Sequence, residues 1–247
     1  MRPPLFVVVL FALDLALGVI AVLGAAVAAS AGLEGIEFVR LGAEANLPAW
    51  YSASQLLLVA AIAAVAVWPY ATSGKPGARW AFAPSAFFAL LSLDEGAQVH
   101  ERLGDALEGA SGAGAGLVTG PWLFVAVPLY AALAWVVWKA IRPLLTGRPA
   151  IVWLAIVGGV LFVTSAAGIE ALGNLFAGDM MARRVLGVFE EVGEMIAATT
   201  FVWAAWALLR AEGVQLAVAA PRHSGDGAAL EPRLAVWDEP GVRVASK

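Results

Sequence analysis

Carboxylates and one histidine, side chains that bind metal ions or carry protons, occur in three of the most apolar stretches of this sequence. In each stretch they follow or interrupt a run of Ala, Leu, Val and Phe. Acidic residues inside apolar helices are costly and commonly have a functional role. The candidate metal ligands are Asp94, Glu95, His100, Glu101, Glu170, Glu190, Glu191 and Glu194.

The first group lies on the segment Ser-Leu-Asp-Glu-Gly-Ala-Gln-Val-His-Glu, residues 92–101. With 100° of rotation per residue, one continuous helix would place four polar side chains on a face about 120° wide. These are Asp94, Glu95, Gln98 and Glu101. Ser92 would lie about 60° beyond the Glu95 edge. We therefore predict that Ser92 and Gln98 contact the ligands rather than the metal ion itself.

The second and third groups occur later in the chain at helical spacing. Glu170 and Asn174 are four residues apart and share a helix face, so Asn174 is a further supporting candidate. Glu190, Glu191 and Glu194 fall within about 100° of a helix circumference. Each group would therefore present its polar side chains in one direction.

Depth in the membrane decides whether the three groups can meet. With a rise of 1.5 Å per residue, Asp94 lies about 22 Å from the cytoplasmic Arg79, and Glu170 about 30 Å from the start of its segment. Counted inward from Arg184, Glu194 is about 15 Å deep. We therefore expect all three groups at one level, in the outer half of the bilayer.

Several carboxylates with one imidazole form a hard, oxygen-rich ligand set. Such a set suits iron, manganese, calcium or magnesium, whereas catalytic zinc sites usually contain two or three histidines. Helical bundles that bind two iron or manganese ions use similar ligands, commonly with a Glu-x-x-His pair that does not occur here. The sequence therefore predicts a divalent metal cofactor, iron or manganese before zinc.

Two other interpretations of the acidic groups stay open. Charges at helix ends are often merely hydrated, and intramembrane acids also occur in proton and cation pathways. For a pathway, Asp14 is the candidate inner relay, about 13 Å along the first apolar segment. Otherwise we expect its carboxylate to hydrogen-bond a neighbouring helix. Ser52 and Gln55 lie where they could reach the acidic cluster.

Composition places the chain among integral membrane proteins. Of its 247 residues, 61% are hydrophobic and only 14% are charged, far from the values of soluble domains. Six apolar segments are long enough to cross a bilayer, which needs about 20 helical residues. They are residues 5–29, 47–68, 80–100, 121–141, 151–175 and 185–209. We predict an all-α transmembrane bundle of about six helices.

Basic residues indicate the orientation of this bundle. An inside amino terminus puts Lys75, Arg79, Lys139 and Arg142 on the cytoplasmic side, as the positive-inside rule favours, with both termini cytoplasmic. We expect a transmembrane domain over residues 1–210, a disordered cytoplasmic tail over 211–247 and a flexible outer loop over 109–120. A bacterial-type inner membrane is the expected location, and the chain contains no cysteine.

The acidic segments also carry a resemblance. Ser-Leu-Asp-Glu-Gly-Ala-Gln-Val-His-Glu together with the later Glu-Glu-Val-Gly-Glu-Met resembles a pattern of bacterial multi-pass membrane proteins to which no activity is assigned. Ceramidase-like membrane hydrolases, by contrast, use three histidines around zinc. This sequence has a single histidine, His100, in its membrane region, so that family does not fit.

The leading functional hypothesis is a metal-binding membrane protein, and more specifically a metal-dependent enzyme for a lipid or quinone-like substrate. The alternatives are a cation- or proton-coupled transporter, or an accessory subunit of a membrane complex. Expected partners are the lipid bilayer and either a second copy of the chain or another membrane protein. No nucleic-acid partner is expected.

Overall fold

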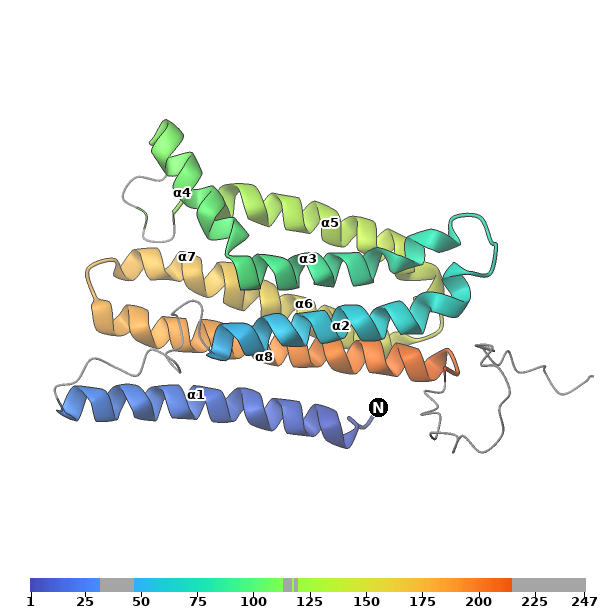
Figure 1. Cartoon of the computed structure of the whole chain (residues 1–247), viewed down its shortest axis with the longest axis horizontal. Coiled ribbons are helices and arrows are strands. Elements are labelled where there is room, and N and C mark those ends of the chain that lie inside the picture. The colour runs from blue at the N-terminus through green and yellow to red at the C-terminus, as the bar shows by residue number, and fades with distance from the viewer. Residues whose placement is uncertain (32–46, 113–116, 118–119, 215–247) are drawn as a thin grey trace, which may run out of the picture. The chain divides into compact units, whose positions relative to one another are not determined.

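A computed structural model describes residues 1–31, 47–112, 117 and 120–214, and these residues form helices and connecting turns with no strand. Figure 1 shows their order along the chain. The elements are α1 (Leu5–Ala31), α2 (Leu47–Ala71), η2 (Ala78–Phe82), α3 (Ala83–Ala97), α4 (Val99–Ser111), α5 (Trp122–Leu145), α6 (Pro149–Val163), η3 (Thr164–Ile169), α7 (Glu170–Gly173), η4 (Asn174–Phe176) and α8 (Met180–Ala211). The predicted tail lies outside the described residues from residue 215 onward.

Five of these stretches are long and apolar enough to cross a membrane. They are Leu5–Gly24, Leu47–Ala71, Trp122–Leu145, Pro149–Phe176 and Met180–Ala211. Large hydrophobic side chains lie exposed along them, as expected of surfaces that face lipid. The predicted segment 80–100 is not among the five, because α3 has only 15 residues. The all-helical prediction is therefore confirmed, and the described membrane-length helices number five.

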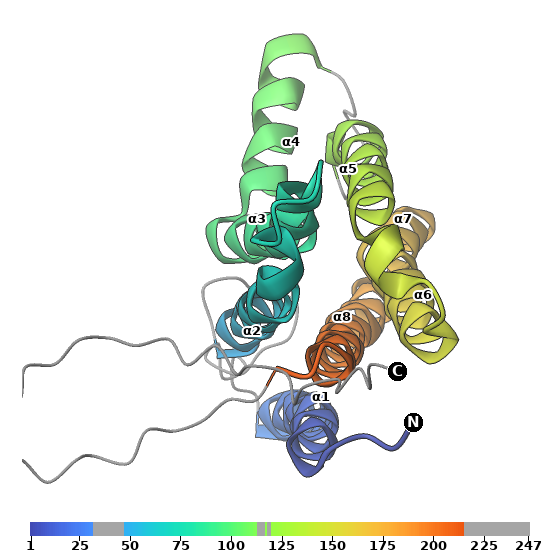
Figure 2. The same cartoon turned by 90° about the vertical axis from the view of Figure 1, so that its right-hand side faces the viewer.

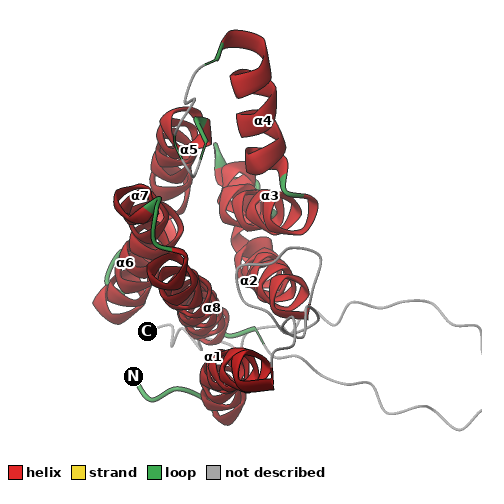
Figure 3. Cartoon of the chain, turned by 90° about the vertical axis from the view of Figure 1, so that its left-hand side faces the viewer, coloured by secondary structure: helices red, strands yellow, loops and turns green. Residues whose placement is uncertain are grey.

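The long helix α8 is the centre of the packing. It contacts α1, α2 and α6, while α3 packs on α2 and on α5. Viewed along the helices, α8 lies between α1, α2 and α6 (Figure 2). The view from the opposite end shows the same helices in red (Figure 3). Every element with a predicted ligand thus belongs to one connected bundle.

Small residues allow helices to approach α8 closely. A Cβ atom built on Gly193 would lie 2.0 Å from the Ser165 Oγ atom, and one on Gly18 would lie 2.7 Å from the Val192 Cγ2 atom. Such close approach is typical of helix packing in membranes. Gly193 and Gly18 therefore determine how near η3 and α1 lie to the acidic part of α8.

The prediction of one continuous helix over 92–101 is wrong. Gln98 has a left-handed backbone with φ 55°, and its N–H bonds to the Asp94 carbonyl as the cap of α3. A new helix, α4, begins at Val99 and continues to Ser111. Glu101 therefore lies on a different helix from Glu95. The predicted loop 109–120 is also wrong at its start, because residues 109–111 are helical.

A π-helix, η3, precedes Glu170 in the Pro149–Phe176 stretch. The wider turn of a π-helix changes the direction of the side chains that follow it, and such segments are frequent at functional sites. Ser165, in this π-helix, is the residue that meets Gly193 of α8. The close contact and the π-helix together determine where Glu170 lies relative to α8.

Candidate metal site

Three glutamates converge between α3 and α8. One ligand oxygen from each of Glu95, Glu191 and Glu194 lies within 4.8 Å of the other two. All three side chains are half-buried. Ser52 on α2 hydrogen-bonds the Glu95 carboxylate, as its position in the sequence suggested. We call these three carboxylates the glutamate triad.

Two further carboxylates surround the glutamate triad. Glu170 and Glu190 both interact electrostatically with Glu194, and Glu190 also interacts with Glu191 and Glu95. The Trp122 indole on α5 donates a hydrogen bond of 2.9 Å to Glu170 Oε1. The site is therefore rich in negative charge, and α5 orients one of its outer members.

Asp94 and His100 form a separate hydrogen-bonded group with Tyr130. Asp94 Oδ2 is 2.6 Å from the Tyr130 hydroxyl and 3.1 Å from His100 Nδ1. Its Oδ1 accepts from the His100 backbone N–H at 2.9 Å. The break at Gln98 makes these contacts possible, because it turns His100 back toward the end of α3. Asp94 is buried with both oxygens engaged by these donors, so the glutamate triad contains neither it nor His100.

His100 lies in α4, outside the membrane-length helices, and three carboxylates act on its ring. Burial lowers the pKa of the imidazole, but the hydrogen bond and charge of Asp94 raise it, and so do Glu101 and Glu170. The combined effect is a raised pKa. His100 Nε2 lies 4.0 Å from Glu101 Oε1. Among the described residues, the ligand atoms that converge belong to Glu95, Glu191 and Glu194 and not to the His100 ring, so this ligand set is all oxygen.

The predicted supporting residues also make contacts within the helices. The Ser92 hydroxyl donates to the Ala53 carbonyl at 2.7 Å and so joins α3 to α2. Asn174 Nδ2 donates to the Ala171 carbonyl at 3.3 Å, within its own helical stretch. Gln98 caps α3. Ser52 hydrogen-bonds Glu95, a member of the glutamate triad.

A second polar cluster lies deeper in the bundle, around Asp14. The Asp14 carboxylate accepts from Thr199 Oγ1 at 2.8 Å, Gln55 Nε2 at 2.8 Å and the Tyr51 hydroxyl at 2.9 Å. The expectation that Asp14 hydrogen-bonds a neighbouring helix is therefore confirmed. Gln55 belongs to this cluster, which joins α1, α2 and α8.

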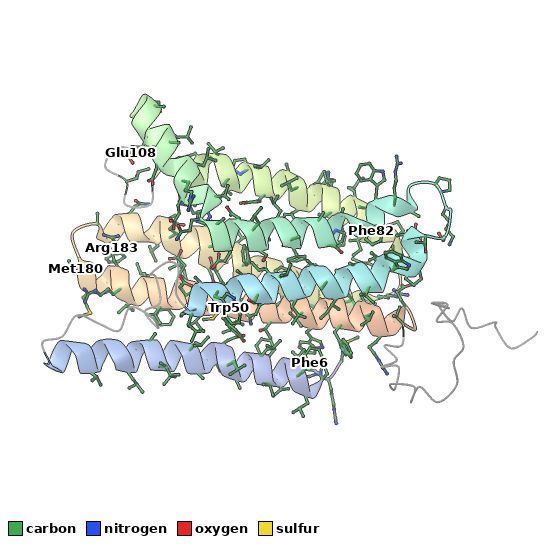
Figure 4. All side chains as sticks on the ribbon, in the orientation of Figure 1. Phe6, Trp50, Phe82, Glu108, Met180 and Arg183 are labelled. Carbon is green, nitrogen blue, oxygen red and sulfur yellow. The ribbon has the colours of Figure 1, made fainter. Side chains whose placement is uncertain are left out.

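Sequence reasoning missed three aromatic partners of these acids. Tyr51 and Tyr130 were not recognised, and a tryptophan near the end of a predicted span, as Trp50 and Trp122 are, is usually interpreted as a membrane-interface anchor. Trp122 is only 7% exposed and bonds Glu170, whereas Trp50, at 66%, fits the anchor interpretation. Figure 4 shows Trp50 on the first turn of α2. The sequence signal that could have identified these residues is a tyrosine hydroxyl or an indole N–H within an apolar span. Such groups usually have a hydrogen-bond partner when they are buried.

A family profile matches residues 5–209. The chain belongs to the family described as Domain of unknown function (DUF8692). The match includes both acidic clusters and all the helices that carry them. This family has no known activity, which agrees with the prediction that the chain matches no family of known activity. No curated protein and no solved structure matches the chain.

Proposed function

We propose that this chain is a multi-pass membrane protein that binds a divalent metal ion through Glu95, Glu191 and Glu194. The observation that carries the proposal is the approach of three carboxylate oxygens, from α3 and α8, to within 4.8 Å of one another. Carboxylate oxygens at this spacing can bind one cation after small side-chain rotations.

Charge supports this proposal. An ionised carboxylate within a membrane helix costs roughly 2.5–3.5 kcal/mol on insertion scales, and adjacent carboxylates repel one another as well. The charged groups that act on Glu194 are four other carboxylates: Glu95, Glu191, Glu190 and Glu170. A divalent cation would offset two of these charges and would satisfy the oxygens that converge.

The ligand chemistry supports a hard cation. Oxygen ligands suit manganese, iron(II), magnesium and calcium, whereas zinc in proteins commonly takes histidine or cysteine. Among the described residues, the converging ligand atoms all belong to glutamates. We therefore propose manganese or iron before zinc, and manganese as the first ion to test.

We further propose six membrane passages, with η2 and α3 together forming the additional one. These two elements run from Ala78 to Ala97, about 30 Å at helical rise. This topology would place both termini in the cytoplasm and Arg183 and Arg184 outside. Figure 4 shows Arg183 at the start of α8, the end opposite to Arg210. A bacterial-type inner membrane fits the balance of basic residues.

For the activity, we propose a metal-dependent reaction on a lipid or quinone-like substrate. A site among helices that cross the membrane would be reached most readily by a substrate that partitions into the bilayer. Glu170, oriented by the Trp122 indole and near Glu194, is the carboxylate we assign to accept a proton beside the metal.

Cation transport is the second candidate function, and the Asp14 cluster favours it. Ser52 bonds Glu95 and Gln55 bonds Asp14, and these two residues lie three apart on α2. Polar groups therefore continue from the glutamate triad toward the interior. A transporter would move Mn²⁺ into proteoliposomes, whereas an enzyme would bind it without net uptake.

Manganese binding to the purified protein tests the proposal. The protein in mild detergent is titrated with Mn²⁺, and free Mn²⁺ is followed by electron paramagnetic resonance. We expect near-stoichiometric binding that the Glu191→Gln, Glu194→Gln double variant loses. The matched control is Glu108→Gln, which changes an exposed glutamate of α4.

Equal binding by the wild type and the double variant would overturn the metal site. Absence of stoichiometric binding of Mn²⁺, Fe²⁺, Mg²⁺, Ca²⁺ and Zn²⁺ to the wild type would also overturn it. Stoichiometric Zn²⁺ with none of the others would retain a metal site but refute the proposed preference for manganese or iron.

A further inference from the structure

The Asp14 cluster is a polar site within the membrane-spanning part of the protein that the proposed metal site does not use. Asp14 is 0% exposed and lies on α1, the first membrane-length helix. From Leu5 to Gly24 it is the only charged residue. A charged acid at that depth is costly unless its surroundings stabilise it.

The partners of Asp14 come from two other helices and are all neutral. Tyr51 and Gln55 lie on α2, and Thr199 lies on α8. Gln55 and Thr199 are 2% and 0% exposed. Among the described residues, Tyr51 is the titratable group that faces Asp14, and no Arg or Lys side chain bonds it. The nearest carboxylate of α8, Glu194, is five residues before Thr199, roughly 8 Å along the helix.

Three side chains of the cluster donate hydrogen bonds to Asp14. The Tyr51 and Thr199 hydroxyls and the Gln55 amide all donate to its carboxylate. The Gln55 amide also lies 2.8 Å from Thr199 Oγ1 and 3.1 Å from the Tyr51 hydroxyl oxygen. This arrangement suits an ionised carboxylate, because a carboxylate only accepts hydrogen bonds.

One acceptor of the cluster has no donor. Gln55 Oε1 is buried, and no donor among the described residues bonds it. Buried acceptors without a donor are rare and costly. The cluster is therefore one hydrogen short in the arrangement that suits ionised Asp14. If Asp14 is protonated, rotation of the Gln55 amide brings Oε1 to the carboxyl group, where it can accept the hydrogen, and the amide nitrogen then takes the position that Oε1 leaves.

Every partner of Asp14 can change its direction of donation. A hydroxyl both donates and accepts, and an amide offers either its nitrogen or its oxygen. A fixed cation such as Arg would hold the carboxylate ionised, and an apolar pocket would hold it protonated. This cluster accommodates both forms with the same residues.

We propose that Asp14, Tyr51, Gln55 and Thr199 form an interior site that binds and releases one proton, separate from the glutamate triad. Asp14 is the group that carries the proton, and the other three are its positioning residues. The inference does not depend on a metal in the glutamate triad.

Infrared difference spectroscopy of the full chain in lipid nanodiscs tests this proposal. Spectra are recorded between about pH 4 and pH 9, the range that covers ordinary and raised carboxyl titrations. Aspartate labelled with ¹³C at the side-chain carboxyl separates aspartates from the many glutamates. We expect a band of a protonated aspartic acid that disappears as the pH rises, is shifted by the label and is absent in Asp14→Asn.

Two controls accompany the infrared measurement. Asp105→Asn changes an exposed aspartate of α4 and should leave the band in place. Thr199→Val keeps the shape of the side chain but removes one donor to the ionised form. It should shift the midpoint of the band upward by about one pH unit, a tenfold change in proton affinity. A structural role alone would not move that midpoint.

The outcomes are distinct. A band that persists over the whole range, or the absence of an Asp14 band at every pH, overturns the proposal and leaves the cluster as a hydrogen-bonded contact between helices. If Asp14→Asn does not fold, the midpoint in Thr199→Val decides the question alone: a shift supports the site, and an unchanged midpoint overturns it. Loss of Mn²⁺ binding in the double glutamate variant, with the Asp14 band intact, would separate this site from the proposed metal site.

Discussion

The two halves of α8 differ in packing although they belong to one helix. From Met195 to Leu209 most side chains are buried, and they pack against α1, α2 and α6. From Met180 to Glu194 the described side chains are half-buried or exposed. The tightly packed half stabilises the bundle, and the looser half contains the carboxylates. The residues that pack α8 into the bundle and the carboxylates of the candidate site thus occupy different halves of the helix.

The contact between Gly193 and Ser165 is where the two halves meet, and changing it should have the largest effect. Gly193→Ala would place a Cβ atom 2.0 Å from Ser165 Oγ. We expect a loss of about 3 kcal/mol in the free energy of unfolding, at the upper end of overpacking costs. Unfolding in detergent, followed by circular dichroism, measures it.

The control for that change is a second substitution on the opposite side of the contact. Ser165→Gly should restore most of the stability that Gly193→Ala removes, because it vacates the space. If the single variant is as stable as the wild type, the two helices do not approach as closely as described.

Substitution in the glutamate triad should separate stability from metal binding. Glu194→Gln removes a charge that four other carboxylates repel, so the metal-free protein should become slightly more stable. Mn²⁺ affinity should fall on the order of 100-fold, or about 2.7 kcal/mol. Thermal unfolding with and without Mn²⁺ measures both, because a bound ligand stabilises the folded state. Reduced stability without metal would contradict the repulsion argument.

Two adjacent glycines of α6 test how α6 packs on the tightly packed half of α8. A Cβ atom on Gly158 would lie 3.0 Å from the Phe201 ring of α8, while one on Gly159 meets no described atom within 4 Å. Gly158→Ala should therefore cost about 1–2 kcal/mol. Gly159→Ala should be neutral or stabilising by up to about 1 kcal/mol, from helix propensity. Equal effects at both positions would show that α6 does not pack on α8 in this register.

The smallest effect is expected from Trp122→Phe. This change keeps an aromatic ring beside His100, whose ring centre lies 4.5 Å from that of Trp122. It removes the indole N–H that donates to Glu170, which should cost about 1 kcal/mol of stability. If Glu170 acts as proposed, turnover of the substrate would fall more than Mn²⁺ binding. A matching Trp153→Phe variant changes an exposed tryptophan and should have no effect.

The sequence predicted the general nature of the fold and part of the site. Glu191 and Glu194 are three residues apart, so any helix places them on one side. Depth counted at helical rise then placed Glu95 near their level. Asp14 was expected to bond a polar group of a neighbouring helix, and Thr199 is one of three such partners.

Other parts depended on tertiary structure that periodicity does not encode. The left-handed Gln98 ends α3 and separates Glu101 from Glu95. Because a Gln is seldom the cap of a helix, no residue in that segment signalled the break. The π-helix before Glu170 contains Ser165, which packs against Gly193 on another helix. The pairing of Trp122 with Glu170 joins residues 48 positions apart.

The Asp14 cluster has a consequence for the synthesis of the protein. Asp14 and Thr199 are separated by 185 positions. Nearly the whole membrane region must therefore be synthesised before the Asp14 carboxylate can bond Thr199, its last partner. At about 5–20 residues per second this delay is roughly 10–40 seconds. Tyr51 and Gln55 are made much sooner, only 37 and 41 positions after Asp14. Packing of α1 against α2 is therefore the first step that gives the Asp14 carboxylate hydrogen-bond partners, and α8 packs last.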